Sequence, residues 1–194
     1  MRFYHGTRTP GLAALVPGAD GKVYLAARRA VAALYIWDFD RNPCKWMGYR
    51  IIDGDVVYLE YFPGALAAFY GGVSGYLYSC EGEYPLNDKL SLAAGVEGEV
   101  PLDACEEIPD VLDFILSLER AGELEIRLFE NLTDEDCAYV RETVWHLIEN
   151  LDLNNHPENP YHAFVRDRFQ DVWITHPFRD RAHPPRCAAA SQSG

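Results

Sequence analysis

The residues of this chain that could do chemistry gather near its start. His5 is followed directly by Gly6 and Thr7, and Tyr24 and Tyr35 come soon after them. An imidazole and a hydroxyl can bond a polar ligand, and aromatic rings can lie against a flat heterocycle. A glycine beside the histidine would let a ligand approach the backbone closely. These residue types predict a ligand cleft.

Two short strands and a helix must position these side chains. An apolar run that ends in a polar turn predicts a strand over residues 3–7. A second strand is predicted over residues 23–27, passing directly into a helix of small residues that carries Tyr35 about three turns along. A histidine and two tyrosines then stand at the ends of neighbouring elements, where ligand clefts are built.

The ordered pair of segments YHGT (residues 4–7) and VYLAARRAVAALY (residues 23–35) resembles the ADP-ribosyltransferase fold. The similarity is to the branch with diphtheria toxin, the poly-ADP-ribose polymerases and the rifampin ADP-ribosyltransferases, and it covers about the first 40 residues. It implies a split β-sheet core with NAD as substrate. It also implies that His5 bonds the adenosine-side ribose, with Gly6 and Thr7 in the same binding segment, and that Tyr24 and then Tyr35 lie against nicotinamide.

The implied reaction needs a carboxylate. Breaking the nicotinamide–ribose bond passes through a cationic, oxocarbenium-like state, which an acidic side chain near the ribose stabilises. In the polymerases that glutamate opens the fourth core strand, but the run that matches it best, residues 74–78, contains no acid. The candidates, in order of preference, are Glu81 or Glu83, then Glu99, then Glu60; similarity to the rifampin-modifying enzymes would point to Glu60 or Asp55.

Three functions therefore stay open. The first is an NAD-dependent ADP-ribosyltransferase that passes ADP-ribose to an acceptor such as a protein or a small molecule. The second is a non-catalytic NAD-binding or protein-interaction module of the same fold, motivated by the missing strand-borne glutamate. The third is an RNA 2'-phosphotransferase, since those enzymes share the fold.

The distribution of charge favours an anionic small molecule over nucleic acid. The chain carries a net charge of −13, yet its first 50 residues hold eight Lys and Arg against three acids. Residues 103–136 reverse this balance, with twelve acids against two arginines. A locally positive field suits a pyrophosphate such as that of NAD, whereas the acidic total charge argues against nucleic acid as a partner.

Composition places the chain among globular proteins. Its 194 residues are 48% hydrophobic, enough for a proper core, and no apolar run approaches the roughly 20 residues of a membrane helix. With no signal-peptide pattern, a cytoplasmic protein without membrane contacts is expected. The five cysteines are scattered and form no CxxC pair, so reduced thiols and no metal site are predicted.

An α+β fold is predicted, with an ADP-ribosyltransferase-like core over residues 1–108, a helical extension over 109–178 and a flexible tail over 179–194. A hairpin is expected at Asp53-Gly54, a strand over residues 73–80, a polar connection over 81–98 and an edge strand from Val100. Three helices are then expected. They begin after Asp110, after Thr133 as part of a capping box, and at Asn159-Pro160.

Overall fold

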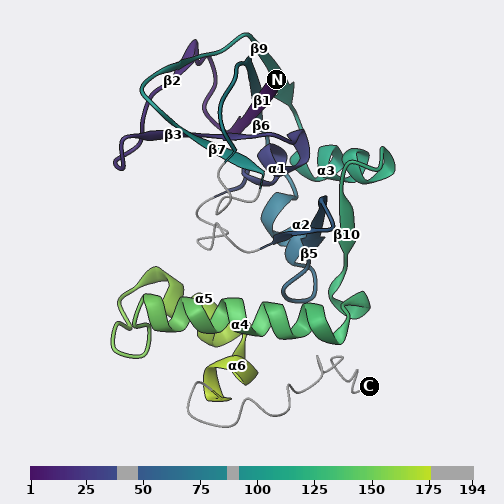
Figure 1. The fold of residues 1–194 in the computed structure, drawn as a ribbon. Coiled ribbons are helices and arrows are strands. Elements are labelled where there is room, and N and C mark those ends of the chain that lie inside the picture. Colours follow the sequence, from purple (N-terminus) through teal and green to yellow (C-terminus); the bar gives the residue numbers. More distant parts are fainter. Residues whose placement is uncertain (39–47, 87–91, 176–194) are drawn as a thin grey trace. The chain divides into compact units, whose positions relative to one another are not determined.

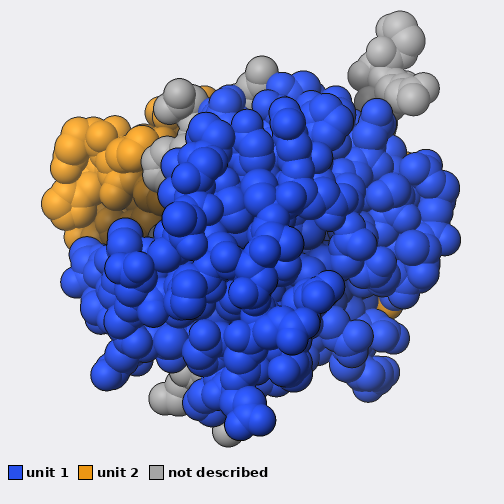
Figure 2. Space-filling view, turned by 90° about the horizontal axis from the view of Figure 1, so that it is seen from above, with its two compact units in different colours: residues 1–45, 49–58, 66–126 blue, residues 46–48, 59–65, 127–194 orange. Residues whose placement is uncertain are grey.

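The computed structural model describes residues 1–38, 48–86 and 92–175 (Figure 1). They form a mixed α+β protein with open antiparallel sheets and several helices. The chain divides into two compact units (Figure 2). The first holds residues 1–45, 49–58 and 66–126, and the second holds residues 46–48, 59–65 and 127–194. Within the described ranges, no helix combines the length and apolar character needed to cross a bilayer.

A five-stranded antiparallel sheet organises the first unit. Its strand order is β7-β3-β1-β6-β9, so the strand that carries His5 lies at the centre. The β1–β6 register pairs Arg2 with Glu81 and Thr7 with Tyr76. The strands are β1 (Arg2–Thr7), β3 (Lys22–Ala26), β6 (Gly75–Glu81), β7 (Ala93–Glu97) and β9 (Ala104–Ile108).

Each face of this sheet is covered by different elements. One face carries a core that also includes Leu15 and Val100, from the two-stranded ribbon of β2 (Ala14–Leu15) and β8 (Val100–Pro101). The other face receives α1 (Arg29–Leu34), which lies across the sheet from β2 (Figure 1). Alanine is the best helix former and has a small side chain, so this Ala-rich helix can approach β1 closely. The sheet residues of the first core are Phe3, Val23, Leu25, Cys80 and Ala94.

The remaining elements of the first unit follow local signals. Asp53 and Gly54 both have positive φ, as a two-residue hairpin turn of type I′ requires, and this confirms the predicted hairpin of β4 and β5. Asp110 accepts a hydrogen bond from the Asp113 amide and caps α3, as predicted. The elements are β4 (Tyr49–Ile52), β5 (Asp55–Leu59), α2 (Ala65–Tyr70), α3 (Val111–Arg120) and β10 (Glu125–Arg127); β5, α2 and β10 each have one end residue assigned to the second unit.

The second unit is helical. The predicted capping box is present: the Thr133 hydroxyl accepts from the Asp136 amide, and the Asp136 carboxylate accepts from the Thr133 amide. Asn159 caps a helix that has Pro160 at its first position, also as predicted. The helices are η1 (Phe129–Asn131), α4 (Asp134–Asn150), α5 (Pro160–Arg168) and α6 (Gln170–Thr175).

Several sequence-based expectations need correction. The stretch 81–98 is not only a connection, because it contains β7, which pairs with β3. Tyr35 caps a six-residue helix and so stands less than two turns along it. The last predicted helix is divided in two, since Phe169 leaves helical geometry between α5 and α6.

The domain division also differs from the predicted one. The structure assigns residues 109–126, including α3, to the same unit as the sheet, whereas the sequence pattern placed them in a helical extension. The predicted tail, residues 179–194, lies outside the described residues.

The cysteines are not all reduced. Cys80 and Cys105 are free thiols, but Cys137 is disulfide-bonded, so the prediction is wrong for that residue. Disulfide pairing depends on which cysteines the fold brings within a few ångströms, and scattered spacing does not reveal this.

Candidate functional site

His5 is held by the backbone of the neighbouring strand. Its ring is half-buried, and Nδ1 lies 3.1 Å from the carbonyl oxygen of Tyr24. A carbonyl can only accept, so Nδ1 is the donor, and Nε2 of the neutral ring is left as an acceptor. Burial lowers the pKa of His5, and the hydrogen bond to Tyr24 opposes this in part. The ring is therefore a neutral acceptor at physiological pH.

This contact marks the point where β1 and β3 stop pairing. Within these two fully described strands, the only residues paired across the ladder are Tyr4 and Ala26. Beyond this pair, the His5 side chain bonds the backbone of β3. The sheet is thus only loosely closed at this junction, next to Tyr24.

Tyr24 presents its ring to solvent. The residue is 45% exposed, and its hydroxyl donates a 2.6 Å hydrogen bond to Oδ2 of Asp20. That bond raises the pKa of Tyr24 and lowers that of Asp20. The Asp20 carboxylate also accepts from the Lys22 amide, so it holds the tyrosine from a turn at the start of β3. Sequence reasoning missed Asp20, although its position four residues before Tyr24 in a Gly-rich loop was visible.

Gly6 has a different role from the predicted one. A Cβ at this position would lie 1.9 Å from the carbonyl oxygen of Ala32 and 2.8 Å from Cγ1 of Ile36. The glycine therefore makes room for α1 on β1, and the space expected for a ligand is filled by the helix. Thr7 also has a local partner, because its hydroxyl accepts from the Thr9 amide at 3.2 Å.

Tyr35 belongs to an aromatic group at the end of α1. Its ring centroid lies 5.3 Å from that of Trp37 and 6.2 Å from that of Tyr49. The hydroxyls of Tyr35 and Tyr49 are 3.4 Å apart. Tyr35 is 41% exposed, so this group, all within the first unit, offers an aromatic surface.

The strand register separates His5 from the preferred acid. Residues paired across an antiparallel ladder share a face, and faces alternate along a strand. Arg2 pairs with Glu81 and His5 pairs with Tyr78, so Glu81 and His5 point to opposite faces of the sheet. Glu81 instead bonds Arg2 at 3.1 Å, with both side chains exposed. By the same alternation from the Tyr4–Ala26 pair, the Tyr24 side chain also leaves on the face opposite to His5.

His5 makes no hydrogen bond or ion pair with any of the other predicted acids, all of which are described residues. Glu83, Glu99 and Asp55 are exposed. Glu60 is buried in the second unit, where its carboxylate accepts from the Phe129 amide at 3.1 Å. Of the predicted residues, the structure brings together His5 and the Tyr24 backbone, and it adds Asp20.

Comparison of the chain with protein-family models, with curated proteins and with solved structures gave no match. The basis for a function is therefore the placement of the side chains. Among the described residues, no group of three or more His, Cys, Asp or Glu side chains could hold a metal ion.

Proposed function

We propose that this chain is an ADP-ribosyltransferase-like protein that binds NAD where β1 and β3 stop pairing. The observation that carries the proposal is the His5 contact: Nδ1 is committed to the Tyr24 carbonyl, which leaves Nε2 as an acceptor beside a loosely closed strand junction. A ribose hydroxyl is a donor that suits such a nitrogen.

The other residues take roles that follow from their exposure. The Tyr24 ring, held by Asp20, and the aromatic group of Tyr35 offer flat surfaces for nicotinamide. Both lie on the face of the sheet opposite to His5, so a bound NAD must extend around the strand junction to reach them. The Thr7 hydroxyl already accepts one hydrogen bond but can still donate one. In the proposed reaction the nicotinamide–ribose bond breaks and ADP-ribose passes to an acceptor such as a protein, a small molecule or water.

The placement of the acids favours a second candidate, an NAD-binding module without transferase activity. Glu81 leaves the sheet on the face opposite to His5 and is bonded to Arg2. A carboxylate in that position would not stabilise a ribosyl cation held by His5. The two candidates share the binding step and differ in whether nicotinamide is released.

Calorimetric titration with NAD tests the shared step, and chromatographic detection of nicotinamide separates the candidates. We expect wild-type protein to bind NAD and His5→Ala to bind it about tenfold more weakly, as for a lost hydrogen bond to a ligand. His146→Ala, which removes an exposed histidine from α4, is the matched control and should bind as the wild type does. A melting curve for each variant shows whether it still folds. His5→Gln serves as a more conservative substitution in case His5→Ala does not.

The pH dependence of NAD affinity is an independent test of the role of His5. Protonation of His5 removes the acceptor at Nε2, and its pKa lies below the ordinary value. The acid-side loss of NAD affinity should therefore begin at a lower pH than an ordinary histidine would give. Nicotinamide release supports the transferase, binding without release supports the module, and absence of NAD binding refutes both.

A further inference from the structure

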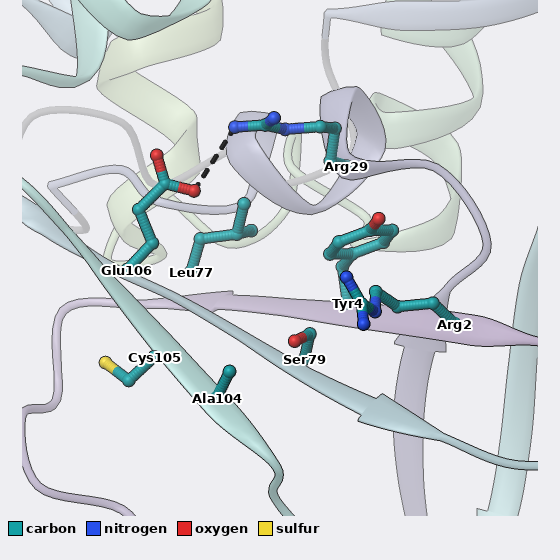
Figure 3. Close-up of a pocket in the computed structure, with 8 residues that line it drawn as sticks. All are labelled: Arg2, Tyr4, Arg29, Leu77, Ser79, Ala104, Cys105 and Glu106. Carbon is teal, nitrogen blue, oxygen red and sulfur yellow. Dashed lines mark hydrogen bonds and ion pairs between the residues drawn. The ribbon is translucent and has the colours of Figure 1, made fainter.

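A second group of polar side chains lies on the face of the five-stranded sheet opposite to His5. Tyr4 pairs with Ser79, which pairs with Ala104, so these residues share the face that also carries Arg2. Arg29 reaches the same space from α1, and Figure 3 shows Tyr4 standing between the two arginines. These side chains line a cavity of about 230 Å³. We propose that it binds a small oxyanion of the phosphate type.

The cavity offers two positive charges and two hydroxyls. A guanidinium has five N–H donors. Arg29 uses one of them on Glu106, at 3.2 Å, and its buried Nε has no hydrogen-bond partner. Arg2 likewise uses one on Glu81. The hydroxyls of Tyr4 and Ser79 are not hydrogen-bonded to any other described residue, so all four side chains retain donors for an anion.

Arg29 is held in place before any ligand arrives. Its guanidinium carbon lies 5.1 Å from the centroid of the Phe114 ring, and one of its terminal nitrogens is paired with Glu106. A guanidinium fixed in this way loses little side-chain entropy when it binds an anion, which favours affinity. The volume is below the roughly 300 Å³ at which drug-sized ligand pockets begin, so a small group fits better than a large one.

Glu106 provides a specific test of the proposal, because its carboxylate competes with a bound anion for Arg29. Its carboxylate lines the cavity and occupies one side of Arg29, as the dashed line in Figure 3 marks. An anion must share Arg29 with it, so removing the charge of Glu106 should tighten anion binding. Glu107 is the matched control, because it is exposed on the same strand but pairs with Tyr76 on the opposite face.

The experiment is a titration of the whole chain with inorganic phosphate and, separately, with sulfate. Binding is monitored through the NMR chemical shifts of the backbone amides. We expect saturable binding to wild-type protein with a Kd of about 1 mM and shifts at β1, β6 and α1. Arg29→Gln should weaken binding about tenfold, and Tyr4→Phe about threefold. Arg28→Gln, the adjacent exposed arginine that does not line the cavity, should change it less than about twofold.

The two glutamate variants distinguish anion binding in this cavity from a general effect of the protein's net charge. We expect Glu106→Gln to tighten phosphate binding about threefold and Glu107→Gln to leave it nearly unchanged. Equal effects of Arg29→Gln and Arg28→Gln, or of the two glutamate variants, would overturn the proposal, as would absence of saturable binding. Should Arg29→Gln fail to fold, Tyr4→Phe and Glu106→Gln still test the site. Phosphate binding should persist in His5→Ala, which separates this site from the NAD proposal.

Discussion

Replacing Gly6 by alanine tests whether this glycine serves the helix or a ligand. The added Cβ would stand 1.9 Å from the Ala32 carbonyl oxygen and 2.8 Å from its carbon. Both atoms are helix backbone, so no side-chain rotation relieves the contact. To reach about 3.4 Å, where ordinary contacts begin, α1 must move away from β1 or the strand must bend. Residues 30–34 of that helix are all buried, so either movement disturbs the core.

The expected cost follows from that displacement. Overpacking a well-packed site costs about 1–3 kcal/mol, and more where the backbone must shift. Alanine otherwise gains up to about 1 kcal/mol over glycine in an extended strand, because it loses less backbone entropy on folding. We therefore expect Gly6→Ala to lower the free energy of unfolding by about 3 kcal/mol, which corresponds to a fall in Tm of about 6–12 °C.

Urea and thermal unfolding, with hydrogen exchange at the amides of β1 and β6, would measure this loss in the unit that contains the sheet. Gly18→Ala is the matched control, because its Cβ would meet its nearest neighbour, Asp20 Oδ1, at 3.4 Å. It should change the free energy of unfolding by no more than about 0.5 kcal/mol. Wild-type stability in Gly6→Ala would refute the assignment of this glycine to helix packing.

Two further predictions concern hydrogen-bonded carboxylates. Asp20→Asn should lower the pKa of Tyr24 toward its ordinary value, because the bond to the carboxylate is what raises it; NMR titration of the tyrosine ring measures this, and an unchanged pKa would contradict the pairing. Asp136→Ala should cost about 2–4 kcal/mol at neutral pH, because it removes the capping box and an ion-pair partner of Arg127. Burial raises the pKa of Asp136, but its hydrogen bonds with Thr133 and then Arg127 outweigh this and lower it. The carboxylate's contribution is therefore complete above about pH 4 and is lost as the pH falls through the folded-state pKa, so urea unfolding should show a smaller difference between wild type and Asp136→Asn in acid.

The parts of the fold that follow from local chemistry could be predicted from the sequence. Asp110, Thr133 with Asp136, and the Asp53-Gly54 turn each act on backbone groups a few residues away. All the residues that make up such a signal lie within a few positions of one another in the sequence. The helix starts and the hairpin were correct for this reason.

The parts that depend on distant partners could not be predicted in the same way. β7 has a weak strand composition, and its conformation is fixed by pairing with β3, where Tyr24 opposes Gly95. Gly6 looked like a ligand contact because nothing nearby in the sequence indicates that the Ala32 carbonyl lies against it. The assignment of α3 to the sheet unit likewise depends on long-range contacts, among them the hydrogen bond from the Val111 amide to the Val73 carbonyl.

The alternation of faces limits which acid could serve His5. On β6 the positions that share its face include Tyr78 and Cys80, and on β7 they are Ala94 and Val96, none of them acidic. The strand-borne acid on that face is Glu107 of β9, which is separated from β1 by β6 and lies roughly 12 Å away by strand spacing. A one-residue change of register would reverse every one of these placements. An acid for ribosyl transfer must therefore reach His5 from a loop, so nicotinamide release, more than NAD affinity, decides whether the proposed NAD-binding arrangement is catalytic.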